Sequence, residues 1–378
     1  MGEFIRPFVH RLRLSKPWNY KVPLLMIMPF FLLNTLEIQG GQAIALYACA
    51  LITSVGFAGF GYTTNDLSDE EADRMVGKSN SAITYGKTNM ILMAFGFLLV
   101  ALLPWMYLPS DSFSLLLIVL ELLLFMLYAF PPFRLKNKGV VGVFTDALYA
   151  YVVPAVLATW TFYLAGDKKM ANLTLFILPL ALWLLFVGLR GIVYHQLADF
   201  ENDALAGSTT WVQSIGRQTA EKIIVRFLLP LEIGTLGFFL WFLSEHGRYI
   251  PLFFGVWMFY GLYLYWRNKP ESAEPPYKQW TNVMLDQAYT EWLPLVVLLT
   301  VGTTVCSTWV ILCIHLVLFR SPLKDFICSL HQWILCSWPI RKFAQLSNFQ
   351  QGLVHFFLIV LFIIFYLSGL FFFMQMLH

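Results

Sequence analysis

The sequence has little charge. Asp, Glu, Lys and Arg make up 12% of its 378 residues, about half the share in an ordinary soluble domain, whereas 58% of the residues are hydrophobic and 17% are aromatic. It also lacks the alternating polar and apolar segments of a transmembrane β-barrel. These absences argue against a soluble protein and a barrel, and they predict an integral membrane protein of the all-α class.

Cysteine is scarce as well. The five cysteines show no CxxC pattern and no Cys/His spacing typical of a metal site. Most of them lie in apolar surroundings, where cysteine usually serves as a small packing residue. We therefore interpret the cysteines as packing residues.

Apolar segments long enough to cross a bilayer recur along the whole chain, and short loops separate them. They predict a polytopic membrane helical bundle of about nine core transmembrane helices plus a C-terminal extra helix. We assign residues 1–318 to this domain, and residues 319–378 to an interfacial segment followed by the last helix. The stretch 284–319 fits either one tilted span or a span with a re-entrant piece. The predicted spans are 22–38, 43–63, 89–109, 113–130, 141–164, 172–197, 223–245, 249–266, one within 284–319, and 353–377.

Basic residues are distributed unevenly among the loops. They concentrate in alternate loops, which should therefore be cytoplasmic, and the opposite loops hold only Lys168, Lys169 and Arg248. No small-residue cleavage site follows the basic start of the chain, so we expect an uncleaved N-terminus. The cytoplasmic set is Arg6, Arg11, Arg13, Lys16, Lys21, Arg74, Lys78, Lys87, Arg134, Lys136, Lys138, Arg217, Lys222, Arg267, Lys269 and Lys278.

Against this background, the stretch GYTTNDLSDEEADRMVGKSN, residues 61–80, is unusually acidic. If the second span continues through it, Asp66, Asp69 and Asp73 fall on one helical face. Like charges on one face repel, unless cations bind there, and hard carboxylate oxygens suit Mg²⁺. The alternative is a solvated acidic loop at the membrane boundary.

A second acidic stretch favours the metal hypothesis. YHQLADFENDALAGSTTWVQSIG, residues 194–216, follows the sixth span and places Asp199 and Asp203 on one helical face. Both stretches are expected at the cytoplasmic surface, which suggests an internal duplication of a span with an acidic end. Two facing acidic helix ends can hold Mg²⁺ ions and bind a diphosphate between them.

These residues resemble a known family. The patterns Asn65-Asp66-x-x-Asp69-x-x-x-Asp73 and Asp199-x-x-x-Asp203 are similar to the two aspartate-rich motifs of the UbiA superfamily of intramembrane prenyltransferases. Between them, YAFPPFRLKNKGVVGVFTDALYA, residues 128–150, resembles the tyrosine, proline pair and basic loop that follow the fourth helix in that family. The resemblance covers roughly residues 10–305.

The resemblance implies a Mg²⁺-dependent enzyme that transfers a prenyl group from an isoprenoid diphosphate donor to an acceptor within the lipid bilayer. Its charge chemistry is physically reasonable, since divalent ions and basic side chains stabilise the leaving diphosphate. The metal ligands implied are Asp66, Asp69, Asp73, Asp199 and Asp203. The residues implied to bind the diphosphate are Asn65, Lys78, Tyr128, Arg134 and Lys136, although the three cations also serve as topology determinants.

Ionisable groups inside spans are further candidates, because such groups are usually functional. Asp146 and Asp286 are candidate catalytic residues beside Asp69 and Asp199, since either can take the proton lost from an acceptor. Candidate acceptor or pocket residues are Tyr62, Arg190, His195 and Glu291. Arg190 fits equally well in a buried ion pair between helices. Glu121 and Glu232, deeper in their spans, are structural or border the pocket.

The acceptor is less determined than the donor. The stretch after the first motif, which ends at Asp73, reads RMVGKSNSAI rather than the arginine-rich stretch of members that prenylate hydroxybenzoate. We therefore expect a hydrophobic aromatic or lipid acceptor without choosing between them. Three alternatives remain open: a terpene cyclase of the same fold, a transporter, and a non-catalytic lipid-binding protein. A transporter would place its charges near the bilayer midplane. We expect no nucleic-acid partner.

Overall fold

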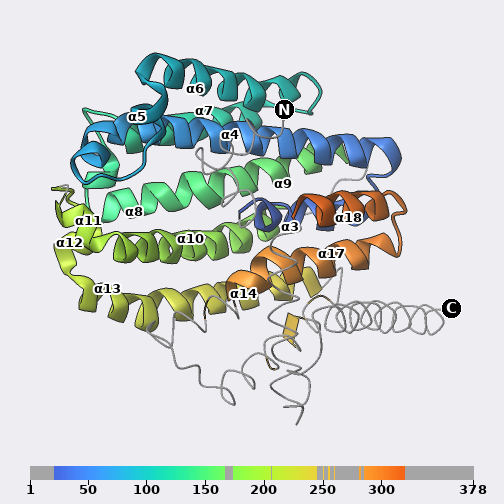
Figure 1. The fold of residues 1–378 in the computed structure, drawn as a ribbon. Helices are drawn as coiled ribbons and strands as arrows, with labels where there is room; N and C mark the ends of the chain where they lie inside the picture. Colours follow the sequence, from blue (N-terminus) through green and yellow to red (C-terminus); the bar gives the residue numbers. More distant parts are fainter. Residues whose placement is uncertain are drawn as a thin grey trace, which may run out of the picture. The chain divides into compact units, whose positions relative to one another are not determined.

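The computed structural model describes residues 21–166, 173–205, 207–244, 250, 254–255, 259, 281 and 285–319 (Figure 1). Throughout these ranges the regular structure is helical, which confirms the predicted all-α membrane bundle. The chain divides into two compact units, Met1–Pro322 and Leu323–His378, and the described residues all belong to the first. The predicted interfacial segment and tenth span lie outside the described residues, and the predicted domain boundary stays a prediction.

Within the described ranges, six helical runs are long and apolar enough to cross a membrane: Gly40–Met75, Lys87–Met106, Ser112–Ala129, Val140–Ala165, Leu173–Ala198 and Arg217–Ser244. Lys21–Thr35, Ala288–Gly302 and Ser307–Leu318 are shorter apolar helices. The predicted span at 249–266 lies largely outside the described residues, so the count of nine stays a prediction. The stretch 284–319 is not one continuous span, because the helix ends at Gly302 and a new one begins at Ser307.

The helices have the following bounds: α3 Ile27–Thr35, α4 Gly40–Met75, α5 Ser81–Tyr85, α6 Lys87–Leu102, α7 Ser112–Ala129, α8 Val140–Ala147, α9 Val153–Ala165, α10 Leu173–Ala198, α11 Phe200–Leu205, α12 Trp211–Ile215, α13 Arg217–Ile223, α14 Leu229–Ser244, α17 Leu293–Gly302 and α18 Ser307–Leu318. Short 3₁₀ turns are η1 Leu103–Met106 and η2 Leu135–Asn137. Single π-helical turns are η3 Leu148–Val152, η4 Ile224–Leu228 and η6 Ala288–Trp292.

The long helices lie side by side with nearly parallel axes (Figure 1). α4 packs against α6, α7 against α9, and α10 against both α8 and α14, while α17 contacts α3 and α18. This arrangement brings the last turns of α4 and α10 to the same end of the bundle. The short helices α5, α11 and α12 lie there as well (Figure 1).

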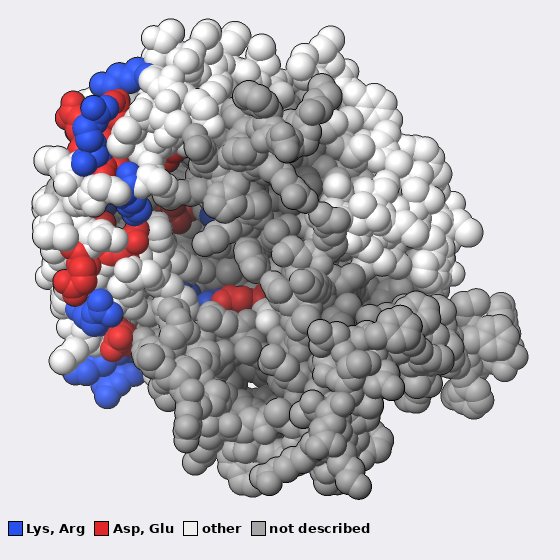
Figure 2. Space-filling model, in the orientation of Figure 1, with Lys and Arg blue, Asp and Glu red and all other residues white. Residues whose placement is uncertain are grey.

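Charge gathers at this end, which we call the acidic end (Figure 2). The length of α4 explains its position, because 36 residues extend for about 54 Å, whereas the hydrocarbon core of a bilayer is about 30 Å thick. The acidic residues of α4 occupy its last turns, after the apolar part has ended. An apolar helix of this length therefore carries its charged end out to the membrane surface.

Glycines allow α4 to approach its neighbours closely. A Cβ atom added at Gly56 would lie 2.2 Å from the backbone nitrogen of Ala101 on α6, and one at Gly59 would lie 2.3 Å from the ring of Phe97. A Cβ atom added at Gly61 would lie 2.5 Å from the ring of Phe125 on α7. Small residues at such contacts let membrane helices pack through their backbones.

We expect Gly56→Ala to destabilise the protein, because the new methyl group meets the backbone of Ala101, which cannot move aside as a side chain can. The free energy of unfolding should fall by about 1–3 kcal/mol, the usual cost of overpacking. Gly96→Ala on α6 is the matched control, since a Cβ atom there has no neighbour within 4 Å. The measurement is thermal unfolding in detergent. Equal melting temperatures for the two variants would show that α4 and α6 do not pack in this register.

Candidate active site

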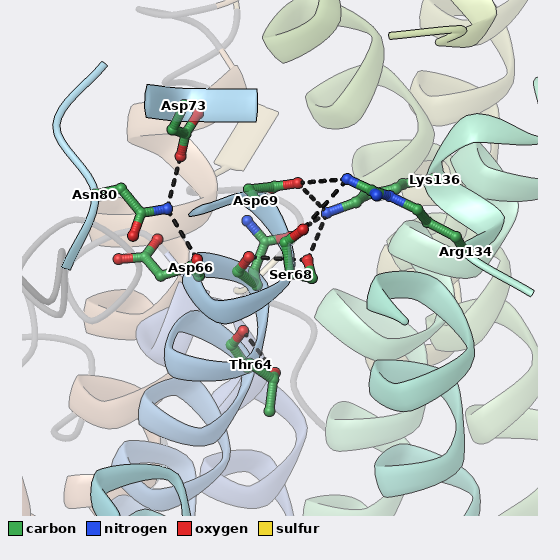
Figure 3. A network of polar contacts seen from close by, with 10 residues as sticks. Thr64, Asp66, Ser68, Asp69, Asp73, Asn80, Arg134 and Lys136 are labelled. Carbon is green, nitrogen blue, oxygen red and sulfur yellow. Dashed lines mark hydrogen bonds and ion pairs between the residues drawn. The ribbon is translucent and has the colours of Figure 1, made fainter. Parts of the chain in front are cut away.

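The end of α4 carries the first acidic cluster, Asp66, Asp69 and Asp73, whose side chains point in two directions (Figure 3). Asp69 faces the loop after α7. Lys136 Nζ lies 2.5 Å and Arg134 Nη2 lies 3.2 Å from Asp69 Oδ1. Asp66 and Asp73 face the loop before α5 (Figure 3). The predicted single acidic face is therefore divided between two loops.

Lys136 ties the loop after α7 to α4. Its ammonium group also donates to Ser68 Oγ at 2.7 Å and to Asn65 Oδ1 at 3.3 Å. Burial lowers the pKa of Lys136, and the carboxylate of Asp69 opposes that shift. Arg134 donates further to the backbone carbonyl of Ser68 at 3.3 Å. The predicted basic loop thus lies directly over the first motif.

Asn80 organises the other side of the first acidic cluster. Its side-chain amide donates to Asp73 Oδ2 at 2.8 Å and to the backbone carbonyl of Asp66 at 2.9 Å. The backbone N–H of Ser81 donates to Asp66 Oδ2 at 2.9 Å, and Asp66 is only 7% exposed. The carboxylate of Asp66 therefore holds the first turn of α5.

The second acidic cluster, Asp199 and Asp203, lies at the end of α10 and in α11. Lys78 Nζ is 2.8 Å from Asp199 Oδ2, and Nδ1 of His195 is 3.8 Å from the same oxygen. Thr210 donates to Asp203 Oδ2 at 3.3 Å. Burial raises the pKa of Asp203, and the neighbouring charge of Asp199 raises it further.

The two clusters are built alike, as the expected duplication requires. Asp73 accepts from the side chain of Asn80, and Asp203 accepts from the side chain of Thr210, in each case seven residues later in the chain. Each acceptor is the last carboxylate of its cluster. Each donor lies just before a short helix, α5 or α12, over the acidic end.

At the position equivalent to Asp66, the second acidic cluster has a neutral residue, Gln196. The N–H of Ser81 binds Asp66, and the N–H of Val212, in the first turn of α12, donates to Gln196 Oε1 at 3.1 Å. Asp66 precedes Asp69 by three residues, and Gln196 precedes Asp199 by three residues. In the second acidic cluster, Gln196 therefore has the part that Asp66 has in the first: it holds the start of a short helix.

The two clusters are electrostatically connected. Lys78 forms the ion pair with Asp199 and also interacts electrostatically with Asp73 and Asp203. Tyr128, at the end of α7, interacts electrostatically with both Asp69 and Asp203. Lys78 and Tyr128 therefore lie between the clusters, which brings predicted residues from α4, α7 and α10 into one site.

A cavity of about 820 Å³ extends from this site into the bundle. Five of the predicted residues line it: Tyr62, Asn65, Tyr128, Asp146 and His195. Its walls also include the π-helical turn η3, where Tyr149 donates to Asp146 Oδ1 and its ring packs 5.2 Å from that of Tyr128. A cavity of this size is typical of a small-molecule site.

Three other predicted residues lie elsewhere. Arg190, 2% exposed, binds Glu232 on α14 through contacts of 2.6 and 3.0 Å, and Nη2 of Arg190 lies 2.6 Å from Asp286 Oδ1. Glu291 is 4% exposed in η6. Among the described residues that line the cavity, neither Arg190 nor Asp286 nor Glu291 is found. Of the two predicted possibilities for Arg190, its contacts match the buried ion pair between helices, with Glu232 as a partner.

Sequence reasoning missed several polar residues of the site. Ser68 occupies a variable position within the first motif, and Asn80 and Thr210 stand outside the motifs, yet each binds a motif residue or its cation. For Asn80 and Thr210 a signal was present, because both follow the last aspartate of a motif by the same number of residues.

The family comparison agrees with this geometry. The model of the UbiA prenyltransferase family matches residues 25–284, more than half of the chain. No curated protein sequence matches the chain.

Solved structures share the fold. The structure of a UbiA homolog from Archaeoglobus fulgidus bound to GPP and Mg²⁺ is 18% identical, with a TM-score of 0.53 over 78% of this chain and 99% of the other. The same homolog bound to DMAPP and Mg²⁺ is 17% identical, with the same TM-score and coverage. Since the family model covers the chain from α3 to α14 with both acidic clusters, the chain belongs to the UbiA prenyltransferase family and is a multi-pass membrane protein.

Proposed function

We propose that the protein transfers a prenyl group from an isoprenoid diphosphate to an aromatic or lipid acceptor within the membrane, with Mg²⁺ as its cofactor. The observation that carries this proposal is the pair of similarly built acidic clusters, joined by Lys78, at the mouth of a largely apolar cavity. The clusters supply the charge chemistry for a diphosphate. The cavity supplies the space for an apolar chain.

The side chains present fit Mg²⁺ when the diphosphate completes the coordination. Within the described ranges no three His, Cys, Asp or Glu side chains form a metal cluster by themselves. Mg²⁺ does not need such a cluster, because it is usually bound by one or two carboxylates, with waters and substrate phosphates in the other positions. Asp69 and Asp73 of the first cluster, which face different loops, and Asp199 and Asp203 of the second would each contribute a carboxylate to an ion held between the clusters and the diphosphate. When bound, the ions would neutralise the diphosphate as it leaves.

Asp66 has a different place in this proposal. Its carboxylate holds the N–H of Ser81, and the equivalent Gln196 carries no charge. We therefore assign Asp66 to positioning α5 over the site rather than to charge neutralisation. The sequence pattern alone implied a metal ligand here.

Three cations are placed to bind the diphosphate oxygens. Arg134 and Lys136 contact Asp69, and Lys78 contacts Asp199, so each lies beside a carboxylate proposed to bind metal. As the allylic carbon–oxygen bond breaks, its electron pair leaves with the diphosphate, and these cations stabilise the added charge. Asn65 and Tyr128 complete the mouth of the cavity.

The cavity holds the reacting carbon and the acceptor. Tyr62 and Tyr128 present aromatic rings that can stabilise an allylic cation. The acceptor forms a bond to that carbon and loses a proton, and Asp146, bound to the Tyr149 hydroxyl, is placed to receive it. We assign no chemical role to Asp286 and Glu291, because Asp286 pairs with Arg190 and neither is among the described residues that line the cavity. The positive-inside pattern supports a cytoplasmic acidic end.

We expect Asp69→Asn and Asp199→Asn each to lower turnover of geranyl diphosphate about a hundredfold, because each removes charge that stabilises the transition state. Asp66→Asn is the matched control. The amide oxygen of Asn can still accept from the N–H of Ser81, so this variant should keep most of its activity. The measurement is product formation with Mg²⁺ and with EDTA in place of the metal. Full turnover in EDTA, or a loss in Asp66→Asn as large as in Asp69→Asn, would contradict these assignments.

We also expect the prenyl group to reach a second molecule. The purified protein should consume geranyl diphosphate slowly by itself and form a prenylated adduct when an aromatic or membrane-lipid extract is added. Mass spectrometry of the products is the measurement. Rapid conversion of the donor alone to a cyclic hydrocarbon, with no adduct from any extract, would favour a terpene cyclase instead.

A further inference from the structure

Glu121 on α7 is a carboxyl group in the wall of the cavity. It is 1% exposed, and its neighbours on the helix, Leu117, Ile118 and Phe125, belong to the apolar core. Among the residues that the structure describes, its Oε2 atom has no hydrogen-bond partner. A buried carboxyl oxygen without a partner is costly, so its presence in the cavity wall calls for a ligand.

Two further polar atoms in the same wall also have no partner within the described part of the chain. They are Thr53 Oγ1 on α4 and Trp105 Nε1 in η1. The two side chains lie at a similar depth, because Gly56, one turn after Thr53, packs against Ala101, one turn before Trp105. A hydroxyl group and an indole N–H group thus line the cavity at a similar depth.

Positive charge is present nearby. Lys21 lines the cavity, lies 4.7 Å above the ring of Tyr151, and interacts electrostatically with Glu121 and Asp146. No ion pair within 4 Å joins Lys21 to a carboxylate of the described residues. The cavity wall therefore carries both donors and acceptors of hydrogen bonds.

The depth of these groups separates them from the diphosphate. Glu121 lies eight residues, or about 12 Å at the helical rise, before the end of α7 at Ala129. Thr53 lies about 20 Å before Asp66 along α4. An isoprenoid chain has no hydrogen-bonding atom beyond its diphosphate, so a polar group bound at this depth must belong to a second molecule.

We propose that Glu121, Thr53 and Trp105 form a deep subsite that binds a hydroxyl or amine group of the acceptor. Glu121 accepts a hydrogen bond from that group, while the Thr53 hydroxyl and the Trp105 N–H contact it from below. The carboxylate of Asp146, in the same cavity wall, disfavours an acceptor with a carboxylate at this position. This inference rests on the proposed function, because it identifies the bound molecule as the acceptor of the prenyl group.

The test compares two probes of similar shape, 2-naphthol and 2-methylnaphthalene, which differ by a hydroxyl in place of a methyl group. Their binding to the full-length protein is measured by titration calorimetry in detergent, without donor, so that no turnover occurs. We expect 2-naphthol to bind about tenfold more tightly, the effect of one hydrogen bond in a buried site. Glu121→Leu should remove this preference. Each probe partitions into micelles to the same extent for every variant, so this effect cancels when the preference is compared between variants.

Ser54→Ala is the matched control. Ser54 lines the same cavity, but its hydroxyl donates to the carbonyl of Ala50 within α4 at 2.8 Å, so this variant should keep the preference. Thr53→Val and Trp105→Phe should reduce it. The absence of a preference in the unaltered protein, whether both probes bind or neither does, overturns the deep subsite. A preference that survives Glu121→Leu overturns it as well.

Two readouts separate this inference from its alternatives. If Glu121 binds a ligand rather than supporting the fold, the melting temperature of Glu121→Leu without probe should equal or exceed that of the unaltered protein, and a lower one overturns the assignment. Binding of geranyl diphosphate with Mg²⁺ should be unchanged in Glu121→Leu. A protein that prefers 2-naphthol but does not bind geranyl diphosphate would retain the deep subsite and refute the proposed function.

Discussion

Repulsion between carboxylates at one end of an apolar bundle is the constraint on which the site depends. Asp69 and Asp73 lie in the last turns of α4, and Asp199 and Asp203 lie at the end of α10 and in α11, so the bundle holds all four at one end. Lys78, Lys136 and Arg134 offset this repulsion by direct ion pairs. The loops that carry these cations are thereby held over the mouth of the cavity. Charge neutralisation thus fixes the backbone that the proposed chemistry needs.

The two acidic clusters have similar backbones around them, but different side chains offset the repulsion between their carboxylates. Each acidic helix is followed by a loop, a short helix, and a glycine with positive φ, Gly86 at 82° or Gly216 at 80°, where the next long helix begins. Glycine tolerates this conformation, which other residues rarely adopt. The cations differ, since Asp69 pairs with the loop after α7 and Asp199 with Lys78 from the loop after α4. The loop that follows the first acidic cluster therefore supplies the cation of the second.

The sequence predicted the parts of this structure that depend on local pattern. Long apolar runs identified the helices, and the spacing of Asp199 and Asp203 identified a cluster that lies at the same end as the first. It did not predict contacts between distant segments. The partners of Arg190, Glu232 and Asp286, are 42 and 96 residues away, and no periodicity links them. Hydropathy also could not locate the break after Gly302, because both flanking helices are apolar.

The contact of Asp66 shows a further limit of pattern. Its spacing from Asp69 and Asp73 predicts a metal ligand on one helical face, but that spacing does not predict that Oδ2 accepts from the backbone N–H of Ser81. The pattern locates a side chain around the helix axis, but the loop that follows decides which group it meets. The equivalent position in the second acidic cluster helps here, because Gln196 accepts from a backbone N–H at the start of a short helix without carrying a charge.

The central claim is that the two acidic clusters act together on one diphosphate. A double-mutant cycle tests it most directly, with the dissociation constant of geranyl diphosphate measured at saturating Mg²⁺ for the unaltered protein, Asp69→Asn, Asp199→Asn and the double variant. Groups that share a ligand should give losses that are not additive, with an interaction energy above about 0.5 kcal/mol. Losses that add within that margin would show that the clusters bind independently, and would contradict a single shared site.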